Sequence, residues 1–171
     1  MTRRPRLLII DPSVVWPEEE GVAQVLGDWP GEWRVARPAL SPGDGPDCGA
    51  GYDWDGVVVM GSRASVHDNP PWMRELGAWL QPILDGAHRL PVLGICFGHQ
   101  LIAHRVGAEI GFVHPDRSEE KGIQETVFER SRLVRDGRRM RVIASHEEEV
   151  KVAPAGYRVV ARRSHVPVDA L

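Results

Sequence analysis

The fold is decided by the stretch Leu90-Pro91-Val92-Leu93-Gly94-Ile95-Cys96-Phe97-Gly98-His99-Gln100-Leu101-Ile102-Ala103-His104. The apolar run at 92–95 predicts a strand, and the residues after Gly98 predict a helix. A sharp turn must join them at Cys96, and a Cβ on either side of such a turn would collide with the strand or the helix. Gly94 and Gly98 remove those atoms, so the stretch predicts a strand, a tight turn and a helix.

Cys96 is therefore interpreted as a nucleophile. The turn places its sulfur above the carboxyl end of the strand and at the positive end of the following helix, where a thiolate is favoured. The alternative is a structural cysteine buried in a parallel sheet, which is the commoner setting for a cysteine with apolar neighbours. The two glycines favour the nucleophile.

Three segments carry a resemblance to a known family. Residues 94–100 resemble the active-site turn of the class I (triad-type) glutamine amidotransferases, in particular stand-alone GMP-synthase-like amidotransferase domains. Residues 55–68 resemble the family's oxyanion strand and loop, and residues 144–150 resemble its Ser-His substrate loop. The resemblance runs from about Asp55 to the end, whereas the first fifty residues fit loosely.

The resemblance implies an activity and a set of site residues. Cys96 would attack the side-chain carbonyl of glutamine and form a γ-glutamyl thioester, with no cofactor and no metal. Backbone amides would stabilise the oxyanion, and other groups would hold the amino-acid end of the substrate. The residues assigned in this way are Gly61, Ser62 and Phe97 for the oxyanion hole, and Gln100, Ser145 and His146 for substrate binding.

Two departures from the family pattern stand out. The family's loop is usually Gly-Gly-Pro, whereas this chain has Gly61-Ser62-Arg63; a positive φ at the second position would strain a serine. In the family, a Phe-His-Pro-Glu segment beyond the point that matches Leu171 supplies the catalytic histidine and glutamate. We identify no residue for these two roles, and we expect the 171-residue chain to be poorly active or inactive alone.

The seven histidines give no convincing substitute. His114-Pro115-Asp116 imitates the missing segment, but it follows the nucleophile helix directly, where the family has a variable loop. His146 matches a substrate-binding position. The others have ordinary structural interpretations: His67, His88, His99, His104 and His165. Two alternative functions therefore stay open, a γ-glutamyl peptide hydrolase of the same fold and a relative that binds a ligand or partner without turnover.

Composition limits the class of protein and its partners. A chain of 171 residues predicts a single domain, here residues 1–171, incomplete at its C-terminus relative to the family. Hydrophobic residues make up 42%, charged residues make up 26% and the net charge is −3, with basic residues scattered. We expect a soluble cytoplasmic protein that binds glutamine or a γ-glutamyl compound, and neither nucleic acid nor membrane. A separate ammonia-accepting synthetase is a further expected partner.

Cys48, in a Gly- and Pro-rich loop, is expected to be a bystander without a disulfide.

Patterns along the chain predict an α/β three-layer sandwich with a mostly parallel central sheet, flavodoxin-like and lacking the last strand and helix of the family. Short apolar runs predict strands, and recurring apolar positions predict helices. Alternating polar residues in the later runs indicate partly antiparallel strands. The predicted strands are 6–10, 33–36, 56–60, 92–95, 122–128, 140–144 and 157–161, and the predicted helices are one around 22–26, one at 71–85 and one after Cys96. Residues 37–53 are predicted to form a surface loop.

Overall fold

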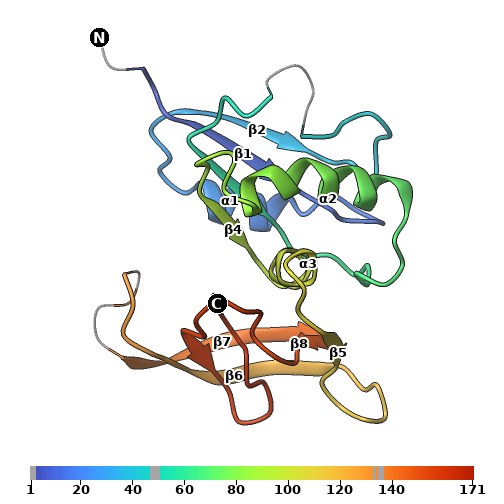
Figure 1. Ribbon diagram of the computed structural model, residues 1–171, viewed down its shortest axis with the longest axis vertical. Coiled ribbons are helices and arrows are strands. Elements are labelled where there is room, and N and C mark those ends of the chain that lie inside the picture. Colours follow the sequence, from blue (N-terminus) through green and yellow to red (C-terminus); the bar gives the residue numbers. More distant parts are fainter. Residues whose placement is uncertain (1–2, 47–50, 133, 135–136) are drawn as a thin grey trace. The chain divides into compact units, whose positions relative to one another are not determined.

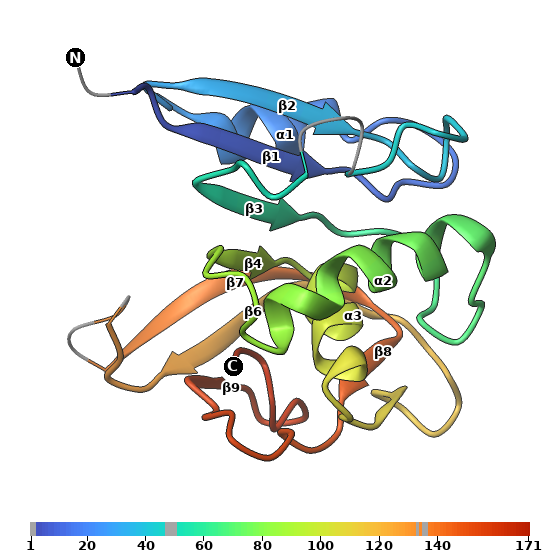
Figure 2. The same cartoon turned by 45° about the horizontal axis from the view of Figure 1, so that its top comes forward.

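The computed structural model describes residues 3–46, 51–132, 134 and 137–171 of the chain, drawn in Figures 1 and 2. It divides into two compact units, Met1–Ile102 and Ala103–Leu171. That the whole chain is a single domain stays a prediction. Cys48 lies outside the described residues, and so does the prediction made for it.

A parallel sheet of four strands forms the centre of the first unit. Its order is β2-β1-β3-β4, and the strands are β1 (Arg6–Ile10), β2 (Glu32–Ala36), β3 (Gly56–Val59) and β4 (Val92–Gly94). β3 and β4 are hydrogen-bonded in parallel, with Val57 opposite Val92. This confirms that the strands predicted at 56–60 and 92–95 are neighbours, and it brings their carboxyl ends to one edge of the sheet.

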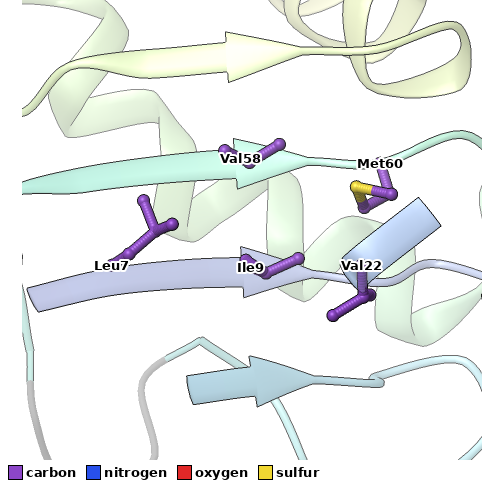
Figure 3. Packing of buried hydrophobic residues seen from close by; sticks show 5 residues of the cluster. All are labelled: Leu7, Ile9, Val22, Val58 and Met60. Atoms are coloured by element: carbon purple, nitrogen blue, oxygen red, sulfur yellow. The ribbon is translucent and has the colours of Figure 1, made fainter. Parts of the chain in front are cut away.

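Two helices cover opposite faces of this sheet, which confirms the predicted α/β layers (Figure 1). They are α1 (Glu19–Leu26) and α2 (Pro71–Leu84). α1 contributes Val22 to a core cluster that it shares with β1, β3 and the residue after β3 (Figure 3). The members of the cluster are Leu7, Ile9, Val22, Val58 and Met60. α2 buries the apolar face that its spacing predicts, including Leu76, Leu80 and Ile83. No helix in the described part of the chain is long and apolar enough to cross a membrane.

The second unit contains two small antiparallel sheets. One pairs β5 (Ile110–Phe112) with β8 (Glu148–Val150). The other has the order β7-β6-β9 and consists of β6 (Glu120–Phe128), β7 (Arg138–His146) and β9 (Ala161–Arg162). The predicted antiparallel character of the later strands is therefore confirmed.

One strand predicted in this unit is wrong, and two strands of the structure were not predicted. The strand predicted at 157–161 is wrong except for Ala161, which belongs to β9; Tyr157 to Val160 are irregular. β5 and β8 were not predicted. Each has three residues, and so short a segment carries too little periodicity to be recognised. Their existence depends on pairing with each other across almost forty residues of chain.

Candidate active site

Cys96 lies between β4 and α3 (Phe97–Arg105), in a turn that we call the elbow, residues 94–98. Its φ is +50°, a left-handed conformation that costs an L-residue about 1 to 3 kcal/mol. The residue is exposed. A strained, exposed cysteine at a strand-to-helix turn is the arrangement that presents a nucleophile to a substrate, so the structural cysteine in a sheet core is not what the fold contains.

The two glycines of the elbow are required by close backbone contacts. A Cβ on Gly94 would lie 2.5 Å from the carbonyl carbon of Gly98, and a Cβ on Gly98 would lie 2.1 Å from the carbonyl oxygen of Val59. Real Cβ atoms do not approach other heavy atoms so closely. The predicted reason for glycine on both sides of Cys96 is therefore confirmed.

Gly61 lies directly beside Cys96. A Cβ built on it would be 3.6 Å from the Cβ of Cys96. The loop that contains it, residues 60–64, is called the Gly61 loop. Met60, at its start, donates its amide to the carbonyl of Ile10 at 2.9 Å and accepts at its own carbonyl from the amide of Gly98 at 3.2 Å. The loop is thus fixed at its start to the end of β1 on one side and to the elbow on the other.

Ser62 follows Gly61 without the strain considered from the sequence. The non-glycine residues with positive φ in the described part of the chain are Asn69, Cys96 and Arg117, so Ser62 has an ordinary backbone. Its hydroxyl donates to the carbonyl of Pro12 at 2.8 Å and accepts from the amide of Ala64 at 3.1 Å. The Gly-Ser-Arg sequence therefore forms its loop with a side-chain tie that a glycine at position 62 would lack.

Asp11 precedes Pro12, whose carbonyl accepts the hydrogen bond from Ser62. The sequence did not identify Asp11 as a functional residue. The carboxylate is fully buried at the end of β1. It accepts from the amide of Ser13 at 3.2 Å, from the amide of Glu18 at 3.0 Å and from Nε of Arg37 at 3.2 Å. A buried carboxylate needs such partners to offset its lost hydration. The Asp-Pro pair after a buried strand is the signal that could have indicated it.

Phe97 and Gln100 continue from the elbow into α3. Phe97 is fully buried, and its ring lies 6.0 Å from that of Trp72. Gln100 is also buried, and its backbone amide donates to the carbonyl of Cys96 at 3.0 Å. Amides in the first turn of a helix have no intrahelical acceptor. The backbone amide of Gly98 donates to the carbonyls of Met60 and Ile95. The backbone amide of Phe97 lies one residue earlier, at the start of the helix.

Ser145 and His146 lie in the second unit, as the last two residues of β7. The Ser145 hydroxyl donates to Oε1 of Glu119 at 2.6 Å. Nε2 of His146 lies 2.8 Å from Nη2 of Arg163, and Nδ1 lies 2.9 Å from the carbonyl of Glu148. Arginine can only donate, so Nε2 accepts and the proton is assigned to Nδ1. Both side chains are engaged within their own unit.

His114, which imitates the family's catalytic segment, pairs with a carboxylate in the second unit. Its Nε2 lies 2.8 Å from Oε2 of Glu120. A carboxylate can orient a histidine in this way, and the prediction that His114 is not catalytic stays untested. Within residues 3–46, 51–132, 134 and 137–171, no three histidine, cysteine, aspartate or glutamate residues form a group that could hold a metal ion.

A parallel α/β sheet with a strained cysteine at the end of a strand defines the class of nucleophile-elbow proteins. Within that class, this chain belongs to the class I glutamine amidotransferase family, because the family's model, "Glutamine amidotransferase class-I", matches residues 50–169. The match includes the elbow and the Gly61 loop. It leaves β1 and α1 outside, which agrees with the loose resemblance of the first fifty residues.

Individual relatives agree with this assignment. The chain is 35% identical over 120 residues to a subunit of the glutamine-hydrolysing GMP synthase of Pyrococcus furiosus, covering 68% of this chain and 62% of that protein. It is 36% identical over 83 residues to the corresponding protein of Thermococcus kodakarensis, covering 48% of this chain and 43% of that protein. The chain thus matches less than two thirds of the length of either relative.

Solved structures show the same fold at lower identity. A glutamine amidotransferase of Thermotoga maritima superposes with a TM-score of 0.73 at 19% identity, over 98% of this chain and 70% of that one. A Thermoplasma acidophilum protein thought to be a subunit of GMP synthase gives 0.76, also at 19% identity, over 98% and 77%. These likenesses confirm the predicted fold class.

Proposed function

We propose that Cys96 serves the hydrolysis of the side-chain amide of glutamine through a γ-glutamyl thioester, and that the 171-residue chain alone turns over poorly or not at all, because no catalytic histidine or glutamate is identified in it. The observation that supports it most is the elbow, because Cys96 is exposed, has a φ of +50° and faces Gly61. In the reaction, the sulfur bonds to the amide carbon, the carbon–nitrogen bond breaks, and ammonia leaves with a proton that balances the one lost by the thiol. Water then cleaves the thioester, which gives glutamate and restores the thiol.

The oxyanion of the tetrahedral intermediate would be stabilised by backbone amides. Those of Phe97, at the start of α3, and of the Gly61-Ser62 turn are the proposed donors. An oxyanion donor typically contributes about 3 to 4 kcal/mol to lowering the barrier. Gln100, Ser145 and His146 are proposed from the family resemblance to bind the substrate.

A separate ammonia-accepting synthetase is the proposed partner. The exposed apolar side chains Val14, Val15 and Trp16, at 41, 53 and 79% exposure, support it. They lie in the β1–α1 loop, residues 11–18, whose Pro12 carbonyl accepts from Ser62 of the Gly61 loop. Exposed tryptophans are frequent anchors of interfaces. Co-purification with the synthetase from the same source should be lost in Trp16→Ala; equal retention would contradict this partner surface.

Active-site labelling tests the activity. The probe is the chloroketone in which a CH2Cl group replaces the amide nitrogen of glutamine. It should modify Cys96 with saturation, and excess glutamine should slow the modification. Iodoacetamide should also label Cys96 at neutral pH faster than it labels free cysteine. Cys96→Ser is the matched control, because it changes one atom and should abolish both reactions at position 96; any iodoacetamide label on Cys48 is counted separately.

The outcomes separate the proposed function from its alternatives. Chloroketone labelling without saturation, at a rate unaffected by glutamine, would refute a glutamine site. Protection by γ-glutamyl peptides but not by glutamine would indicate the γ-glutamyl hydrolase. Protection by glutamine with no release of ammonia, even when the synthetase is added, would indicate a relative that binds glutamine without turnover.

A further inference from the structure

The Gly61 loop is held from two sides by hydrogen bonds that differ in kind. Its contacts to the elbow and to β1 are made by backbone atoms of Met60, which any residue except proline could provide. Its contact to the β1–α1 loop is made by a side chain, the hydroxyl of Ser62, which donates to Pro12 at 2.8 Å. The same hydroxyl accepts from the amide of Ala64 at 3.1 Å. Position 62 therefore fixes the loop beyond Gly61, where the backbone contacts end.

The acceptor of this hydrogen bond is itself fixed. Pro12 follows Asp11, whose fully buried carboxylate accepts hydrogen bonds from the backbone amides of Ser13 and Glu18. These two amides lie near the beginning and at the end of the β1–α1 loop. Arg37 donates to the same carboxylate at 3.2 Å and to Glu19 at 2.8 Å. The carbonyl of Pro12 is thus held in place by charge-assisted hydrogen bonds around a buried carboxylate.

We infer that Ser62 and Asp11 are positioning residues, which hold the backbone of the Gly61 loop in the orientation that stabilises an oxyanion beside Cys96. This inference rests on the proposed function. Ser62 acts through its hydroxyl on its own loop, and Asp11 acts through Pro12 on Ser62. Preorganised donors stabilise a developing charge because they need no reorientation during the reaction, so loss of either tie should slow the reactions that form an oxyanion.

Two reagents for Cys96 separate this role from a general structural one. With the glutamine chloroketone, the sulfur first adds to the carbonyl carbon and forms an oxyanion. A sulfur–carbon bond to the CH2 group then replaces the carbon–chlorine bond, while the bond from sulfur to the carbonyl carbon breaks and the C=O double bond re-forms; chloride and the thiol proton leave. With iodoacetamide, the sulfur displaces iodide directly and no oxyanion forms. A positioning role predicts that only the first reaction is slowed.

The variants are Ser62→Ala and Ser62→Thr. Because Ser62 has no positive φ, alanine fits the backbone and removes only the hydroxyl. Ser62→Ala should lower the saturated chloroketone rate about tenfold, the size of one lost hydrogen bond, and leave the iodoacetamide rate unchanged. Ser62→Thr keeps a hydroxyl and should restore most of the rate. Ser65→Ala is the matched control, since its hydroxyl accepts from the amide of His67 further along, and it should react like the unmodified chain.

Asp11→Asn extends the test to the support of Pro12. It should also lower the saturated chloroketone rate and leave the iodoacetamide rate unchanged. The double variant should be no slower than Ser62→Ala alone, because both changes act on one contact and their effects cannot add. Thermal midpoints of all variants, measured in parallel, confirm that each is folded.

Each outcome decides the inference. If the unmodified chain saturates with the chloroketone but Ser62→Ala reacts as fast, the inference is overturned while the proposed function stands. If Ser62→Ala slows both reagents equally, the hydroxyl serves stability alone, and the inference is overturned as well. If the unmodified chain shows no saturation, the proposed function fails and the inference fails with it.

Discussion

The parallel sheet of the first unit and the β6–β7 hairpin of the second use apolar side chains in different ways. In β1, Leu8, Ile9 and Ile10 are all fully buried, because helices cover both faces of that sheet. In the hairpin, Ile123 and Ile143 are paired across the two strands, yet they are 61 and 86% exposed. Apolar character in a strand therefore does not by itself indicate burial.

The difference shows where each region can carry chemistry. A strand covered on both faces has no free side chains along its length, so functional groups are placed at its carboxyl end. Cys96, Gly61 and Asp11 all lie just beyond the carboxyl ends of strands of the parallel sheet. The hairpin instead presents side chains along its outer face, where exposed ion pairs such as Arg139 with Glu125 contribute little stability. The first unit should therefore be the more sensitive to substitution.

The largest effect is expected from Gly98→Ala at the elbow. The new Cβ would lie 2.1 Å from the backbone oxygen of Val59, which cannot rotate away as a side chain could. We expect a loss of about 3 kcal/mol or more in the free energy of unfolding. The measurement is urea unfolding followed by circular dichroism, with labelling of Cys96 as a second reading.

Gly45→Ala is the control for this prediction. Nothing lies within 4 Å of its added Cβ, so its stability should change by less than about 0.5 kcal/mol. Equal stability of the two variants would mean that the close approach of Gly98 to β3 does not exist.

A medium effect is expected when a buried residue of the parallel sheet and an exposed residue of the β6–β7 hairpin are both truncated. The two variants are Leu8→Ala and Ile143→Ala. Leu8 is fully buried, so its truncation should cost about 3 kcal/mol. Ile143 is exposed, so the same kind of truncation should cost less than about 0.5 kcal/mol. Denaturant midpoints of the two variants measure the difference. A large loss for Ile143→Ala would show that its exposed side chain is covered in solution, for example by another molecule.

The smallest effect concerns Asp116, on a turn of the second unit. The hydroxyl and the amide of Ser118 donate to its carboxylate at 2.7 and 3.0 Å, and these bonds lower the pKa of Asp116 below its ordinary value. A lowered pKa stabilises the folded state above the ordinary aspartate range, and this contribution is lost as the pH falls through the lowered value.

Ser118→Ala should therefore raise the pKa of Asp116 towards that of a free aspartate, as measured by its carboxyl carbon shift during an NMR titration. Ser118→Thr keeps the hydroxyl and should leave the pKa lowered. An unchanged pKa in Ser118→Ala would show that the hydroxyl does not reach the carboxylate in solution.

The sequence by itself determined the parallel sheet and the tight turn at Cys96. Continuous apolar runs, helix periodicity and the glycines around Cys96 are local signals, and the physics behind them is local as well: buried strands need apolar residues, and a tight turn excludes a Cβ. These signals predicted β1, β3 and β4, both covering helices and the role of Gly94 and Gly98. The strain that the family pattern suggested for Ser62, on the condition of a positive φ, is absent, because φ depends on the path of the loop and not on the residue type alone.

Only the tertiary structure decided the contacts that join distant segments. The hydroxyl of Ser62 meets Pro12 across fifty residues of chain, and the carboxylate of Asp11 meets Arg37 across twenty-six. β5 and β8 exist because they pair with each other. A polar side chain has several possible partners of similar energy, and folding selects one by bringing it within hydrogen-bond distance, so no local pattern in the sequence specifies the choice.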